Sequence, residues 1–207
     1  MKVFLVRHGE TALNAKKVHQ DHRGFLSETG ISQAKKLAER FKHIPIDRIL
    51  ASPFERTTHT AEILQETVQK QIEFTPLLVE IKRPTVLEGK LYDEPEALII
   101  KNQIYEKFHD AAFRHSDEET FIDLRDRSSL LLHYVLSFTE KNILLVTHGE
   151  FLKILVSVMI FGHDVDPRIA LNMYQSFKMT NTGLTICEYR DKSWKLLTWN
   201  DQAHLGE

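Results

Sequence analysis

Residues 2–11 read KVFLVRHGET, an apolar run that leads directly into charged and small polar residues. The first six residues, Lys2 to Arg7, include two valines, a phenylalanine and a leucine, which predicts a short buried strand. The same order recurs at residues 142–150, NILLVTHGE, where an apolar run again ends at a His-Gly-Glu triplet. Two buried strands that end in the same polar group indicate a sheet with polar residues gathered along one edge.

Predicted strands and helices alternate along most of the chain. Apolar residues at helical spacing predict helices at 27–41, 54–69, 119–138 and 149–161. Short apolar runs predict strands at 2–7, 47–51, 72–75, 142–147, 177–180, 184–189 and 194–199. This alternation predicts an α/β fold, a three-layer α/β/α sandwich whose mostly parallel sheet is covered by helices on both faces. The turn at residues 190–192 predicts an antiparallel hairpin at the sheet's edge.

The chain of 207 residues has the length of a single domain, which we expect to span residues 1–207. Its composition, 42% hydrophobic and 27% charged, is that of a globular protein and excludes a disordered or fibrous chain. Residues 82–118 are rich in charge and do not continue the alternation. We expect them to form an inserted lobe of loop and helix.

Charge and cysteine content narrow the classes of partner. The formal net charge is −2, which gives no reason to expect nucleic acid or an anionic membrane as partner. The single cysteine, Cys187, excludes an intrachain disulfide and a cysteine-rich zinc site. Arg7 interrupts the first apolar run after four residues, too few for a secretory signal. We therefore expect a cytoplasmic protein, while its oligomeric state is not encoded in any readable pattern.

Three polar clusters follow three of the predicted strands. Arg7 and His8 follow the first strand, residues 52–56 with Arg56 follow the second, and His148 follows the strand at 142–147. Ligands of open parallel sheets bind at the carboxyl ends of the strands. We therefore expect these two arginines and two histidines to converge on one crevice.

Such a group of side chains suits a phosphoryl group. Each guanidinium presents a planar fork of donors to paired oxygens, and a neutral imidazole is a competent nucleophile toward phosphorus. Nearby arginines lower the pKa of a histidine, which keeps it neutral. A second, protonated histidine would stabilise charge on the phosphoryl oxygens. With this much fixed positive charge, a metal ion is not required to neutralise the transition state.

The same residues carry a resemblance to a known family. Arg7-His8-Gly9-Glu10-Thr11 with Asn14 is similar to the signature of the histidine phosphatase superfamily, also called phosphoglycerate mutase-like. Further segments match family motifs in the right order: Leu26-Ser27-Glu28-Thr29-Gly30 with Gln33-Ala34, Ser52-Pro53 with Arg56 and Thr60-Ala61, Thr147-His148-Gly149, and Asn181-Thr182-Gly183. The resemblance covers about the whole chain, most loosely at residues 82–118.

The resemblance implies phosphomonoester hydrolysis in two steps, through a phosphohistidine and without a cofactor. His8 would be the nucleophile, and Arg7, Arg56 and His148 would hold the phosphoryl oxygens. Asn14 would contact the phosphoryl group or order its loop, although it could also simply cap a turn.

The resemblance also implies a carboxylic acid that protonates the leaving oxygen and then takes a proton from the attacking water. Glu80 falls where the family's acid is expected. It is followed by Ile-Lys-Arg-Pro rather than by a glycine-containing stretch, so Glu88, in Glu88-Gly89, is a second candidate. We favour Glu80.

Alternative functions are a mutase, which returns the phosphoryl group to its product, and a non-catalytic module that binds phosphorylated ligands. Mutases of this family resemble longer chains with a larger insertion and a C-terminal tail. The end of this chain soon after its last predicted strand therefore favours a phosphatase, and the intact set of site residues argues against a binding module.

The substrate is expected to be a phosphorylated small molecule or a phosphoprotein. Lys82 or Arg83, next to Glu80, could bind a second anionic group on it, although short basic pairs usually lie on a solvated face. His19 and His22 have a spacing that metal ligands can show, but without further ligands we expect an exposed loop near the crevice.

Overall fold

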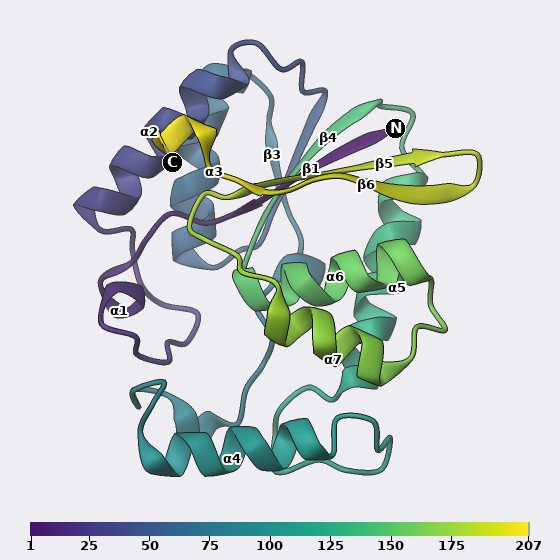
Figure 1. Cartoon of the computed structure of the whole chain (residues 1–207). Helices are drawn as coiled ribbons and strands as arrows, with labels where there is room; N and C mark the ends of the chain where they lie inside the picture. Colours follow the sequence, from purple (N-terminus) through teal and green to yellow (C-terminus); the bar gives the residue numbers. More distant parts are fainter. Residues whose placement is uncertain (207) are drawn as a thin grey trace.

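A single six-stranded sheet organises the molecule, and the computed structural model describes residues 1–206 (Figure 1). The strands lie in the order β3-β2-β4-β1-β5-β6. Strands β3, β2, β4 and β1 pair in parallel, each with the next. Strand β5 pairs antiparallel with both β1 and β6. The strands are β1 (Lys2–Arg7), β2 (Arg48–Ala51), β3 (Ile72–Phe74), β4 (Asn142–Thr147), β5 (Leu184–Arg190) and β6 (Ser193–Asp201). The predicted α/β sheet with an antiparallel edge is confirmed.

Helices cover both faces of this sheet, as the alternation predicts. The α-helices are α1 (Ala12–Ala15), α2 (Glu28–Phe41), α3 (Glu55–Val68), α4 (Pro95–Glu106), α5 (Phe121–Leu136), α6 (Gly149–Phe161) and α7 (Pro167–Ser176). Short 3₁₀ helices lie at Pro76–Leu78, Thr85–Leu87 and Ala203–Leu205. None of the helices in residues 1–206 has the length and apolar character needed to cross a membrane.

Each face of the sheet buries its own apolar cluster, because side chains alternate along a strand. Val3 and Leu5 of β1 pack into a cluster with apolar residues of α5 and α6. Phe4 and Val6 point the other way, into a cluster with α2 and α3. The central strand β1 is therefore apolar on both sides, which explains its unbroken apolar run.

The segment 82–118 lies apart from the sheet. Helix α4 runs along the bottom of the molecule in Figure 1, beneath the layers formed by the sheet and the other helices. Within this segment, Leu87, Ala97 and Ile100 form a small apolar cluster that is separate from the two clusters on the sheet. Because this segment packs around a separate cluster, its loops can approach the sheet's edge without belonging to the main core.

The strand predicted at residues 177–180 does not form. Its backbone groups bond to side chains instead of a neighbouring strand: the carbonyl of Lys178 accepts from the Trp199 indole, and the amide of Thr180 donates to Asn200. The segment just before it is helix α7, which the sequence pattern did not predict. Its start has capping signals, since the Asp166 side chain accepts from the amide of Arg168 and Pro167 occupies the first turn.

Two glycines allow the loop after β1 to lie directly against the start of α2. A methyl group on Gly9 would come within 2.5 Å of the Gly30 carbonyl oxygen, and one on Gly30 would overlap the backbone of Glu10. The Glu10 carbonyl also accepts from the amide of Ser27, the N-cap of α2. The loop that carries His8 is thus fixed by a backbone contact only glycine permits.

Substitution Gly30→Ala should displace this loop. We expect it to reduce the free energy of unfolding by about 1–3 kcal/mol, because the added methyl group has no space. Urea denaturation measures the change. Ser32→Ala, an exposed position of the same helix, is the control and should stay within about 0.5 kcal/mol of wild type. Equal stability of the two variants would contradict the close contact.

Candidate active site

The predicted site residues meet at the carboxyl ends of β1, β2 and β4. Parallel pairing sets Arg7 opposite Thr147, so the residues that follow, His8 and His148, lie side by side with ring centroids 5.2 Å apart. A cavity of about 210 Å³ opens at this edge. Among its lining residues are Arg7, His8, Asn14, Arg56 and Glu80.

His8 is held in one tautomer. Its Nδ1 lies 2.7 Å from the Gly9 carbonyl oxygen, which can only accept, so Nδ1 carries the proton. The lone pair therefore resides on Nε2. Burial, together with the charges of Arg56 and Arg7, holds the pKa of His8 well below its ordinary value. The ring is neutral at pH 7, with its lone pair on Nε2.

Two guanidinium groups flank His8, and backbone carbonyls fix their positions. Arg7 Nη1 donates to the Met179 carbonyl at 2.6 Å, and Arg56 Nη1 donates to the Asp21 carbonyl at 2.8 Å. The Nε atom of each arginine is buried without a hydrogen-bond partner in the described part of the chain. Burial lowers the pKa of Arg56 to about 10, which leaves it charged at pH 7. Both groups retain donors for an anion.

His148 lies behind His8 rather than on the cavity wall. It is fully buried, its Nε2 is 2.8 Å from Ser52 Oγ, and its ring packs against those of His8 and Phe54. Burial, the charge of Arg56 and the neighbouring His8 hold the pKa of His148 well below its ordinary value. The ring is thus neutral at pH 7, which differs from the protonated second histidine expected from sequence. The reason is its complete burial, together with the charges of nearby arginines.

Glu80 and Glu88 occupy different positions. The Glu80 carboxylate lies at the start of α6, where Oε1 accepts from the amides of Ile81 and Phe151 at 2.9 Å. Among residues 1–206, its Oε2 has only a long contact, 3.4 Å, with the amide of Glu150. Glu80 lines the same cavity as His8, whereas Glu88 is exposed and lines a neighbouring pocket.

Asn14 lines the cavity and belongs to a small network around His8. The Asn181 side-chain amide donates to the His8 carbonyl at 3.0 Å and to Asn14 Oδ1 at 3.4 Å. Thr182, in a left-handed conformation, donates its amide to the Arg7 carbonyl at 3.0 Å. The N-cap of α1 is Thr11, so Asn14 itself caps no turn. The loop at 181–183 positions the backbone that carries His8.

The cavity is also lined by residues that sequence spacing does not connect. Arg83 and His19 lie there with Lys101, Tyr105 and Tyr174. His19 is buried, not exposed as predicted, because residues 90–92 pack over it: its amide donates to the Lys90 carbonyl and its ring contacts Tyr92. Lys101 and the tyrosines had no signal in the sequence, since their helices reach the cavity only through tertiary packing.

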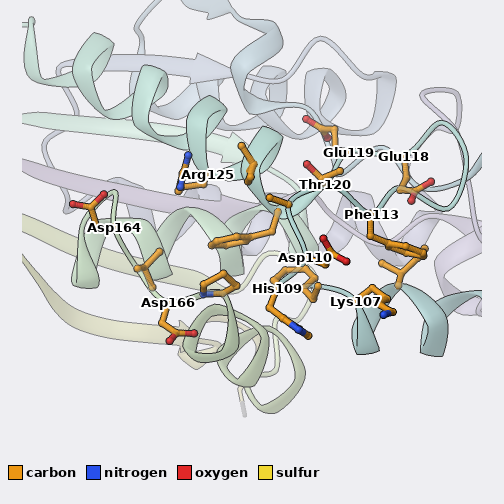
Figure 2. Close-up of a pocket in the computed structure, with 17 residues that line it drawn as sticks. Lys107, His109, Asp110, Phe113, Glu118, Glu119, Thr120, Arg125, Asp164 and Asp166 are labelled. Carbon is orange, nitrogen blue, oxygen red and sulfur yellow. The ribbon is translucent and has the colours of Figure 1, made fainter.

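A larger cavity, of about 310 Å³, lies elsewhere (Figure 2). Its lining residues come from the end of the 82–118 segment, the start of α5 and the loop before α7. None of the residues singled out for phosphoryl chemistry lines it. Size alone therefore does not locate the candidate active site.

Comparison with known proteins agrees with this geometry. The sequence model of the histidine phosphatase superfamily (branch 1) matches residues 3–202. The chain belongs to this superfamily. The match spans every polar cluster that the structure brings together, and the sequence resemblance is confirmed.

Some relatives of this chain are named as phosphatases and others as probable phosphoglycerate mutases. An uncharacterized phosphatase of Bacillus subtilis, PhoE, is 28% identical over 99% of this chain and 96% of its own length. A probable phosphoglycerate mutase of Erwinia tasmaniensis, GpmB, is 26% identical over 100% of this chain and 96% of its own. A relative named as a probable mutase thus aligns over almost its whole length, so chain length does not separate a phosphatase from a mutase.

Solved structures share the fold over nearly the whole chain. The phosphoserine phosphatase of Entamoeba histolytica, in complex with 3-phosphoglyceric acid, superposes with a TM-score of 0.80 at 27% identity, covering 99% of this chain and 98% of that one. YhfR of Bacillus stearothermophilus gives a TM-score of 0.82 at 25% identity, with coverage of 99% and 98%. The α/β architecture is that of histidine phosphatases.

The buried neutral histidines should make stability depend on pH. The pKa values of His8 and His148 are lowered by burial, so the unfolded chain binds more protons than the folded one below about pH 6.5. Their contribution is fully present above that pH and is lost as the pH falls toward the folded values. Each histidine should remove up to about 1.4 kcal/mol per pH unit.

Denaturation at pH 7, 6 and 5 measures this effect. We expect the double variant His8→Asn/His148→Gln to lose less stability between pH 7 and 5 than wild type, and His43→Ala, an exposed control, to match wild type. The same pH dependence in the double variant and in wild type would contradict the assignment.

Proposed function

We propose that this protein hydrolyses phosphomonoesters without a metal ion, through a phosphohistidine at His8. The observation that carries the proposal is the neutral His8 ring with its Nδ1 proton fixed on Gly9, between two arginines that retain unpartnered donors. An imidazole with a free Nε2 lone pair attacks phosphorus, and the guanidinium groups stabilise charge that develops on the phosphoryl oxygens.

In the first step Nε2 of His8 forms a bond to phosphorus, and the bond from phosphorus to the ester oxygen breaks. The leaving oxygen takes a proton from the protonated form of Glu80. The weak contact at Oε2 leaves this oxygen available to hold that proton, while Oε1 stays anchored at the start of α6. The products of this step are the alcohol and the phosphohistidine.

In the second step the Glu80 carboxylate takes a proton from a water molecule, whose oxygen attacks phosphorus. The bond between phosphorus and Nε2 breaks, which releases inorganic phosphate and restores neutral His8. Arg7 and Arg56 hold the phosphoryl oxygens throughout, and Asn14 contacts the group or orders its loop. A phosphoryl dianion bound beside His8 would raise the pKa of His148, whose ring packs against that of His8.

A mutase is the second candidate, favoured by the relatives named as probable phosphoglycerate mutases. It would form the same phosphohistidine but return the phosphoryl group to its product instead of to water. A binding module without turnover is disfavoured because His8, both arginines and Glu80 share the cavity. We propose a cytoplasmic enzyme acting on phosphorylated small molecules, with no nucleic acid or membrane partner.

Substitution His8→Ala should abolish hydrolysis of p-nitrophenyl phosphate. We expect kcat/KM to fall by at least about a thousandfold, because the nucleophile is lost. Wild-type activity should be unchanged by EDTA, and His43→Ala, an exposed histidine, should keep it. Activity that survives in His8→Ala or disappears with EDTA would overturn the proposal.

Labelled phosphate distinguishes the phosphatase from the mutase. Release of inorganic phosphate in proportion to alcohol supports hydrolysis, whereas transfer of the label to added phosphoglycerate supports the mutase.

With an alkyl phosphate as substrate, Glu80→Gln should slow both chemical steps. For an alkyl phosphate, whose leaving oxygen needs a proton, we expect kcat to fall about a hundredfold or more. The p-nitrophenolate ion leaves without protonation, so the first step with p-nitrophenyl phosphate should persist. The variant should then show a stoichiometric burst of p-nitrophenol followed by slow turnover, measured by stopped flow. Glu88→Gln is the matched control; a burst in Glu88→Gln, and not in Glu80→Gln, would reverse the assignment.

A further inference from the structure

The cavity that contains His8 is also lined by two cations from the 82–118 segment. Arg83 comes from the loop after Glu80, and Lys101 comes from helix α4. Both are partly buried, and within residues 1–206 neither forms an ion pair within 4.0 Å. Burial and the nearby charge of Arg83 lower the pKa of Lys101. Glu150 lines the same cavity, but its carboxylate pairs with Lys153 at 3.1 Å. Arg83 and Lys101 therefore have no ion-pair partner of their own in the described part of the chain, which indicates a site for an anion.

His19 is an independent indication that a ligand binds in this cavity. Its side chain is 5% exposed and lines the cavity, and its ring lies 4.6 Å from that of Tyr92. Both ring nitrogens are buried without a hydrogen-bond partner among the described residues. A buried polar group without a partner is costly, and each such group in a native protein needs an explanation. A polar ligand in the cavity would satisfy it.

The neighbouring lysine has a different environment. Lys82 is exposed and pairs with Asp117 at 3.2 Å, outside the cavity. The sequence left Lys82 and Arg83 as equal candidates for contact with a second anionic group. The structure directs only Arg83 into the cavity with His8, and adds Lys101 and His19, which lie 18 residues after and 64 residues before it in the chain.

From these contacts we propose that Arg83, Lys101 and His19 form a second anion subsite. The substrate is then a small phosphate monoester with another anionic group, a carboxylate or a second phosphoryl group. This inference rests on the proposed function, since the ester phosphate must lie between Arg7, His8 and Arg56. The cavity of about 210 Å³ is smaller than typical pockets for drug-sized ligands, which suits a metabolite better than a phosphoprotein segment.

Three compounds on one three-carbon backbone test the subsite. Glycerol 3-phosphate has no second anion, 3-phosphoglycerate adds a carboxylate, and glycerol 1,3-bisphosphate adds a phosphoryl group. We expect kcat/KM of wild type to be at least tenfold higher for one of the two compounds with a second anionic group than for glycerol 3-phosphate. The preferred compound identifies the second group.

Variants connect this preference to the subsite. Arg83→Gln and Lys101→Met should each reduce the preference about tenfold by raising KM for the preferred compound more than for glycerol 3-phosphate. Arg83→Lys, which keeps the charge, should restore part of it. His19→Phe should also weaken the preference, since it removes the donor but keeps an aromatic ring beside Tyr92. Lys82→Met and Lys107→Met are controls from the same segment and should leave the preference unchanged.

Binding measurements separate this proposal from the proposed function. Calorimetric titration of His8→Ala with the same three compounds gives the preference without turnover. Equal affinity for all three, or an unchanged preference in Arg83→Gln and Lys101→Met, would overturn the subsite even if p-nitrophenyl phosphate is hydrolysed. A tenfold preference that both variants abolish supports the subsite even if hydrolysis fails. Faster hydrolysis of a phosphoserine peptide than of any of the three compounds would also overturn it.

Discussion

The parallel pairing of β1 with β4 is the constraint on which the site depends. It sets Arg7 opposite Thr147, and the amide of His8 donates to the Thr147 carbonyl at 3.0 Å, so the two histidines meet. A slip of one residue would exchange the sets that face the two core clusters, with Val3 and Leu5 on one side and Phe4 and Val6 on the other. The packing of both faces therefore also fixes the geometry of the chemistry.

The site keeps its positive charge because carbonyls, not carboxylates, hold its arginines. Arg7 donates to the Met179 carbonyl and Arg56 to the Asp21 carbonyl. A carbonyl orients a guanidinium without neutralising it, whereas a carboxylate would compete with an anionic ligand. Burial lowers the pKa of His8, and the same two arginines lower it further, so the charge that suits a phosphoryl group also helps to keep the imidazole neutral.

The sequence predicted the buried strand at 142–147 more accurately than the segments that connect the strands. The strand at 142–147 was predicted with its observed bounds, because a strand buried on both faces must be apolar throughout. Residues 177–180 have a similar apolar character but form no strand, since their backbone groups bond to side chains of β6. Helix α7 buries Ala170 alone among its ten residues, although Asp166 and Pro167 mark its start.

By itself, the sequence determined the α/β class and the identity of the residues around His8. These residues follow buried strands directly, and the ends of neighbouring parallel strands must meet at one edge. Only the tertiary structure decided that Glu80 and not Glu88 lines the cavity with His8, and that His148 lies behind His8. It also decided that Arg83, Lys101 and His19 line that cavity. These depend on how the 82–118 segment and the loop at 16–25 fold over the sheet's edge, a matter of long-range packing that local spacing does not encode.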